Sequence, residues 1–157
     1  ATPIDATDPA LYDRVMDVNL KGAFFTVQAL LPLMGRGGSI ILNTSWLAEV
    51  GTPGLSLLSA SKAALRSFAR TLSAELLPRG IRVNAVSPGA TETPIHAKTG
   101  MAPDALAAFA ERLTGAIPLG RFGRAEDVAA AALFLASDQS SYMLGAEISV
   151  DGGFAQL

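Results

Sequence analysis

Cysteine is absent from this sequence, and charged residues are scarce. None of the 157 residues is a cysteine, which excludes a disulfide scaffold and cysteine-ligated zinc and is compatible with a cytoplasmic protein. Only 17% of the residues are charged, and 12 basic against 14 acidic residues leave a net charge of −2. This balance, without a polybasic run, argues against nucleic acid as a partner. No apolar run reaches the ~18 residues of a membrane helix, so no membrane partner is expected.

The composition is that of a folded domain. Half of the residues are hydrophobic, which is too many for a disordered segment. A chain of this length buries roughly 68–70% of its unfolded surface, so residues 1–157 are expected to form a single domain. The sequence has neither an initiator Met nor the basic start and apolar stretch of a signal peptide. We therefore expect a processed or excerpted piece of a longer protein.

Helical and strand patterns alternate along the chain. Apolar residues at helical spacing predict helices over residues 8–31, 60–76, 104–113 and 125–136. Short apolar runs near glycines predict strands over residues 39–44, 81–87 and 146–150. The segment from Pro88 to Pro103 is long enough for a lid. This order predicts an α/β fold with a parallel sheet of about three strands, flanking helices and right-handed crossovers.

A series of polar and glycine-containing motifs follows these elements in order. The motifs are Asn19 in Asp17–Gly22, Ser45 after the first strand, Lys62 in Ser59–Leu65, the stretch Gly80–Gly89, Thr93, and the closing Val150–Gly153. Together they resemble the short-chain dehydrogenase/reductase family. The resemblance runs from about Asp8 to the C-terminus and covers only the second half of that family. It implies a partial Rossmann-like, doubly wound sheet and an NAD(P)-dependent oxidoreductase that acts on an alcohol or carbonyl substrate.

The family has a Tyr thirteen positions after its Ser, and a Lys four positions after that Tyr. Here Ser45 plus 13 is Leu58, and Leu58 plus 4 is Lys62, so the spacing is kept and the Tyr is missing. A phenol can transfer the proton that accompanies hydride transfer once a nearby Lys lowers its pKa. Leu58 can neither give nor take a proton. We therefore expect the chain to be impaired, by ~10²–10⁴-fold in rate.

The resemblance also implies roles for the remaining catalytic positions. Ser45 would orient the substrate oxygen. Asn19 would hold a water that links the Lys to solvent, and Lys62 would contact the ribose of the cofactor. The nicotinamide end of NAD or NADP would be lined by Pro88, Gly89, Thr91 and Thr93.

The phosphate end of a dinucleotide site is missing from the sequence. Such cofactors place their pyrophosphate on a glycine-rich turn between a strand and a helix. The glycine-rich stretch Gly35–Gly38 precedes a strand instead, and it is interpreted as a helix terminator. The acidic residue that would contact the adenine ribose is also absent. Half of a dinucleotide site is expected to bind weakly, and the sequence does not distinguish NAD from NADP.

Two other functions stay open. The chain could be a non-catalytic interaction module of the same descent, because the first helix and the helix through Lys62 correspond to helices that pack between subunits in the family; a homo-oligomer is expected. Alternatively, Ser59 and Lys62 have the Ser-x-x-Lys spacing of a serine hydrolase or esterase. No metal site is expected, because the single histidine, His96, lies in the predicted lid. Tyr12 and Tyr142 are interpreted as packing residues.

Overall fold

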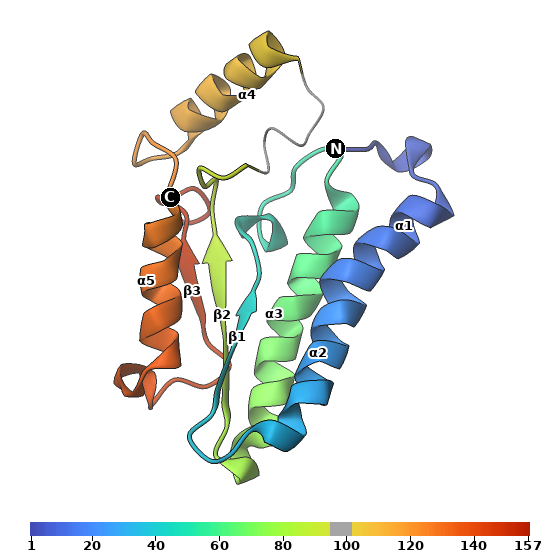
Figure 1. Ribbon diagram of the computed structural model, residues 1–157. Coiled ribbons are helices and arrows are strands. Elements are labelled where there is room, and N and C mark those ends of the chain that lie inside the picture. The colour runs from blue at the N-terminus through green and yellow to red at the C-terminus, as the bar shows by residue number, and fades with distance from the viewer. Residues whose placement is uncertain (95–101) are drawn as a thin grey trace.

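The computed structural model describes residues 1–94 and 102–157. A parallel three-stranded sheet, in the order β1-β2-β3, lies at its centre (Figure 1). The strands are β1 (Ser39–Asn43), β2 (Arg82–Pro88) and β3 (Glu147–Val150). The predicted α/β fold with a Rossmann-like parallel sheet is confirmed. Each predicted strand is present, with its ends shifted by about one residue.

The middle strand, β2, is the most deeply buried of the three. Its side chains at Val83 and Ala85 have no solvent exposure, because helices cover both faces of the sheet and permit a nearly continuous apolar run. The exception is Asn84, which is also fully buried. Its amide donates to the Met143 carbonyl at 3.0 Å, and its side-chain oxygen accepts from the Ala146 backbone N–H at 2.9 Å. This residue therefore guides the chain into β3.

Two helices form the layers on either side of the sheet. The long helix α3 (Ser56–Leu76) packs on one face, and α5 (Ala125–Ala136) packs on the other (Figure 1). The core between α3 and the sheet contains Leu72, Leu76 and Ala69 from the helix and Leu42, Ile81, Val83 and Ala85 from the sheet side. The helix α4 (Pro103–Ala116) lies beyond the ends of β2 and β3 (Figure 1).

The predicted first helix is divided into two parts. The helix α1 (Pro9–Met16) begins after Asp8, whose carboxylate accepts the Leu11 backbone N–H at 2.7 Å. The helix α2 (Gly22–Leu30) continues from it in nearly the same direction (Figure 1). A π-helical turn at Asp17–Lys21 joins the two. Such turns widen the helical backbone locally and are frequent at functional sites, and this one contains Asn19.

Other helix boundaries differ from prediction for local reasons. The helix α3 begins at Ser56, one turn before the predicted residue 60. It is followed by a 3-10 turn and by Gly80, which has a φ of +68°. The helix α4 starts at Pro103, which suits the first helical position. The bounds of α5 agree with prediction. Among residues 1–94 and 102–157, no helix is both long and apolar enough to cross a membrane.

Candidate active site

The carboxyl ends of β1 and β2 open into a cavity of about 490 Å³. In parallel α/β sheets ligands bind beyond the carboxyl ends of the strands. Five of the predicted site residues line this cavity: Ser45, Pro88, Gly89, Thr91 and Thr93. The structure thus brings together residues from two loops that are more than forty positions apart in sequence.

Gly89 is required for the shape of this cavity. A Cβ atom at Gly89 would lie 2.5 Å from the Asp151 Cα, a separation that only glycine avoids. The loop that holds Asp151 is itself rigid, because its carboxylate accepts the backbone N–H groups of Gly153 and Ala155, each at 2.9 Å. On the other side, the Thr91 hydroxyl donates to the Gly89 carbonyl at 3.1 Å. The loop after β2 is therefore held against the loop after β3.

Ser45 has a hydroxyl proton available for a ligand. Its side-chain oxygen accepts the Leu47 backbone N–H at 3.3 Å and thereby caps a 3-10 turn at Trp46–Ala48. Among the residues that the structure describes, none accepts a hydrogen bond from this hydroxyl. Trp46 lines the same cavity and packs its ring edge-on against Phe154, with 4.5 Å between the centroids. Trp46 thus both shapes the cavity and fills space behind it.

Lys62 lies beside the cavity and contacts its wall. Its ammonium donates to the backbone carbonyl of Asn43 at 2.7 Å, and Asn43 lines the cavity. Burial lowers the pKa of Lys62, because the charged form loses hydration. The Lys62 ammonium is therefore held at Asn43, which lies at the end of β1, two residues before Ser45.

Asn19 is connected to α3 through a different residue. Its side-chain amide donates to the Ser61 hydroxyl at 3.2 Å, and that hydroxyl donates to the Leu58 carbonyl at 2.8 Å. Ser61 is fully buried. Ser61 is not among the predicted site residues; its place next to Lys62 on the same helix was the available signal. The relay ties the π-helical turn to the part of α3 that carries Lys62.

Leu58 does not line the Ser45 cavity. It lines a second, smaller cavity of about 230 Å³, together with Asn19 and aliphatic residues of α1. Leu55 lines both cavities and separates them. Of the residues at the family's Ser, Tyr and Lys positions, only Ser45 lines the larger cavity.

Further predictions concern the two tyrosines, His96 and the Ser59–Lys62 pair. The packing role predicted for the two tyrosines is wrong, because Tyr142 is fully exposed and Tyr12 is 48% exposed. Both rings lie on the surface, where the short elements around them offer no apolar layer to cover them. His96 lies outside the described residues. Within residues 1–94 and 102–157 no hydrogen bond joins Ser59 to Lys62, and no cluster of acidic or histidine side chains could hold a metal ion.

The fold and the position of the cavity together define a Rossmann-like protein. A family profile described as Enoyl-(Acyl carrier protein) reductase matches residues 1–155. The chain belongs to the short-chain dehydrogenase/reductase family, as the motifs predicted.

Individual relatives agree with this assignment. The chain is 45% identical to the oxidoreductase asL5 of Sarocladium schorii over 159 residues, which cover 100% of this chain and 62% of that protein. It is 45% identical over 144 residues to the 3-oxoacyl-[acyl-carrier-protein] reductase FabG of Thermotoga maritima, with 90% of this chain and 56% of that protein covered. The chain therefore spans about three fifths of the length of these relatives.

A solved structure is similar over almost the whole chain. The crystal structure of a gluconate 5-dehydrogenase from Burkholderia cenocepacia, in complex with NADP and tartrate, has a TM-score of 0.90 at 33% identity. The similarity covers 99% of this chain and 60% of that one. The fold therefore matches that of an enzyme crystallised with a nicotinamide cofactor.

Proposed function

We propose that residues 1–157 form a single domain, the C-terminal and substrate-side half of an NAD(P)-dependent oxidoreductase that acts on a small alcohol or carbonyl compound. The observation that carries the proposal is the cavity at the strand ends. It combines the Ser45 hydroxyl with the four residues assigned to the nicotinamide end and has Lys62 at its wall. Whole enzymes of this family are longer than this chain, so turnover belongs to the complete protein.

The residues at the cavity fit one end of a dinucleotide. The close approach of Gly89 to Asp151 leaves the backbone of residues 88–91 accessible from the cavity, and Thr91 and Thr93 add hydroxyl groups. When bound, a nicotinamide ring supplies or accepts the hydride. Among the described residues no glycine-rich turn joins a strand to a following helix in the way that a pyrophosphate requires. The described residues therefore contact only the nicotinamide half of the cofactor.

In this mechanism the chain orients a substrate but lacks its usual acid. Ser45 donates a hydrogen bond from its hydroxyl group to the substrate oxygen and so holds the substrate in the cavity. The substrate's remaining groups extend toward α4, where Phe109 and Thr93 also line an adjoining cavity of about 550 Å³, whose walls are apolar apart from two threonines, Glu92 and Arg121. Leu58 supplies no proton to the developing alkoxide, so the rate stays ~10²–10⁴-fold below that of a chain with Tyr there.

Binding of a half-cofactor tests this proposal directly. The purified chain is titrated with reduced nicotinamide mononucleotide, NADPH and AMP, and backbone NMR shifts are followed. We expect the mononucleotide and NADPH to bind with similar, weak affinity, with shifts at residues 88–93, and AMP to bind negligibly. Thr93→Val should weaken binding, whereas Thr71→Val, on the exposed side of α3, should leave it unchanged. Equal binding of AMP, or shifts elsewhere, would contradict the proposal.

A second candidate is a non-catalytic association module of the same descent. Apolar side chains are exposed along the first helical segment, among them Phe25 at 52% and Leu33 at 82% exposure. Burying such side chains against a second copy would remove apolar surface from water. We expect a homo-oligomer at micromolar concentration by light scattering and a shift to monomer in Phe25→Lys. A monomeric wild-type chain would count against this candidate.

A further inference from the structure

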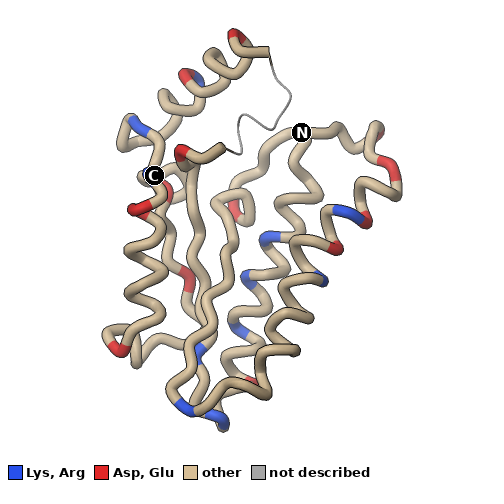
Figure 2. Tube along the Cα trace, viewed as in Figure 1, with Lys and Arg blue, Asp and Glu red and all other residues tan. Residues whose placement is uncertain are grey.

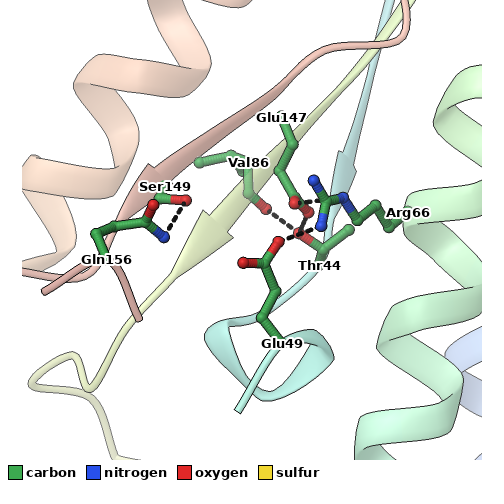
Figure 3. Close-up of polar contacts among 7 residues, drawn as sticks. All are labelled: Thr44, Glu49, Arg66, Val86, Glu147, Ser149 and Gln156. Atoms are coloured by element: carbon green, nitrogen blue, oxygen red, sulfur yellow. Dashed lines mark hydrogen bonds and ion pairs between the residues drawn. The ribbon is translucent and has the colours of Figure 1, made fainter. Parts of the chain in front are cut away.

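An ionic network, buried at Glu147 and partly exposed at Arg66 and Glu49, lies behind the carboxyl end of β1 (Figure 3). Arg66, from α3, is held between two carboxylates: it pairs with Glu49, and its Nε lies 2.8 Å from Glu147 Oε2. The other oxygen of Glu147 lies 2.5 Å from the Thr44 hydroxyl, whose single proton it shares with the Val86 carbonyl of β2 at 2.9 Å. Figure 3 shows these side chains converging from α3, β3 and the segment after β1. No part of this network was predicted from the sequence.

Glu147 needs these partners because it is almost completely buried. Its side chain is 7% exposed, and an unpaired carboxylate in such a position is costly. Arg66 provides the balancing charge for one oxygen, and Thr44 provides a hydrogen bond for the other. By comparison, the exposed pair Lys21–Asp17 has side chains that are 64% and 57% exposed, and pairs of that kind contribute little.

The network meets the candidate site at Thr44, the middle one of three consecutive residues. Thr44 lies between Asn43, whose carbonyl accepts the Lys62 ammonium, and Ser45. Its backbone N–H also donates to the Val86 carbonyl of β2 at 2.9 Å. Lys62 and Arg66 of α3 are four positions apart and so lie on one helical face, and Figure 2 shows a row of basic residues along this helix. The helix is thus tied to residues 43–45 at two successive turns.

We propose that Glu147, acting through Thr44 and Arg66, is a positioning residue that sets the Lys62 ammonium against Asn43 and keeps Ser45 at the mouth of the cavity. This inference rests on the proposed function, because it assigns the network to the alignment of the site. Glu147 touches neither Lys62 nor the cavity. Glu147 acts on the backbone of β1 through its hydrogen bond with the Thr44 hydroxyl. It acts on α3 through its ion pair with the Arg66 guanidinium.

A pair of uncharged substitutions at Thr44 separates positioning from electrostatics. Thr44→Val removes the hydroxyl and keeps the shape, whereas Thr44→Ser keeps the hydroxyl. The readout is competitive acetylation of lysines across a range of pH, measured by mass spectrometry, with exposed Lys21 as an internal reference. In Thr44→Val we expect Lys62 acetylation at high pH to rise about tenfold or more relative to Lys21, the effect of losing one hydrogen bond to a charged group. Thr44→Ser should match the wild type.

The same variant reports on the environment of Lys62. Burial lowers the pKa of Lys62, so release into water should move its labelling midpoint to higher pH. Thr44→Val leaves the charges of Glu49, Arg66 and Glu147 in place, and the shift therefore measures geometry and burial.

A second variant covers the case in which Thr44→Val does not fold. Glu147→Gln keeps the side-chain shape and should also raise Lys62 acetylation, whereas Asp127→Asn, in an ion pair of α5, should not. Unchanged Lys62 labelling in a folded Thr44→Val or Glu147→Gln chain overturns the inference and leaves the network a purely structural one. The labelling needs no cofactor. If Lys62 responds and the mononucleotide does not bind, it is the proposed function that fails.

Discussion

The two cavities on either side of Leu55 differ in what surrounds them. The larger one lies at the strand ends and is lined by hydroxyl groups and by backbone that is held in place, with Gly89 packed against Asp151. The smaller one lies between α1 and the start of α3, and its walls combine aliphatic side chains with the polar side chains of Thr2, Thr7 and Asn19. The family's substrate-orienting Ser position belongs to the first cavity. Its proton-donor position, Leu58, belongs to the second.

The placement of position 58 follows from the chemistry of its side chain. A tyrosine at position 58 would carry a hydroxyl group that needs a hydrogen-bond partner, and the larger cavity, though mostly apolar, offers the hydroxyl groups of Ser45, Thr91 and Thr93. A leucine has no polar group to satisfy, and burying it among the aliphatic residues of the smaller cavity is favourable. The backbone around it is nevertheless intact, because Ser61 still holds the Leu58 carbonyl and Asn19. The backbone arrangement expected around a proton donor is therefore present, whereas the leucine side chain at position 58 cannot donate a proton.

Leu58→Tyr should have the largest effect. We expect ~10²–10⁴-fold faster carbonyl reduction, because the new phenol can supply the proton beside Lys62. NADPH oxidation is measured in the chain joined to the N-terminal segment of the Thermotoga maritima reductase. Leu58→Phe has the same ring without the hydroxyl and should stay at the level of the leucine chain. Equal rates for the two aromatic variants would show that packing, and not acid chemistry, had changed.

Gly89→Ala should disrupt the larger cavity. The added methyl group would lie 2.5 Å from the Asp151 Cα, and overpacking of this kind costs about 1–3 kcal/mol. Urea unfolding should therefore show a clear loss of stability, accompanied by weaker binding of the nicotinamide mononucleotide. Gly51→Ala is the matched control, since nothing lies within 4 Å of its added Cβ. If both variants unfold at the same urea concentration, the close approach at Gly89 is not limiting.

Ser61→Ala should loosen the wall of the smaller cavity. The substitution leaves the Asn19 amide and the partly buried Leu58 carbonyl without their shared partner, and we expect the free energy of unfolding to fall by about 1 kcal/mol. Ser59→Ala, two residues earlier, removes no hydrogen bond recorded in the described part of the chain and should be close to neutral. The same control tests the esterase alternative, which requires that Ser59→Ala abolish any hydrolysis of an activated ester.

The pH dependence of the free energy of unfolding should show the smallest effect. It depends on Lys62. Burial lowers the pKa of Lys62, so at alkaline pH the unfolded chain retains a proton that the folded chain has lost. Between the folded and unfolded pKa values the free energy of unfolding therefore rises with pH. Lys62→Met should flatten this rise, whereas Lys21→Met should not. Identical pH profiles for the two variants would contradict the burial of Lys62.

Much of the fold could be predicted because its signals are local. The apolar period of α3, the glycine and proline that follow it, and the continuous apolar run of β2 each depend on neighbouring residues. The π-helical turn around Asn19 could not be read in this way, because an apolar repeat over residues 8–31 suits an unbroken helix equally well. The surface position of Tyr142 was also missed, because the burial of a ring depends on which elements pack over it.

The amino-acid sequence by itself determined the family, the order of helices and strands, and the presence of Ser45 and Lys62 with a leucine at the position between them. These are properties of residue type and spacing. Only the tertiary structure decided that Leu58 and Ser45 line different cavities, that Asn19 reaches α3 through Ser61, and that Glu147 is joined to Thr44 across the sheet. Such contacts link residues 42 to 103 positions apart. They arise because the parallel crossovers bring distant segments to the same end of the sheet, which no local pattern encodes.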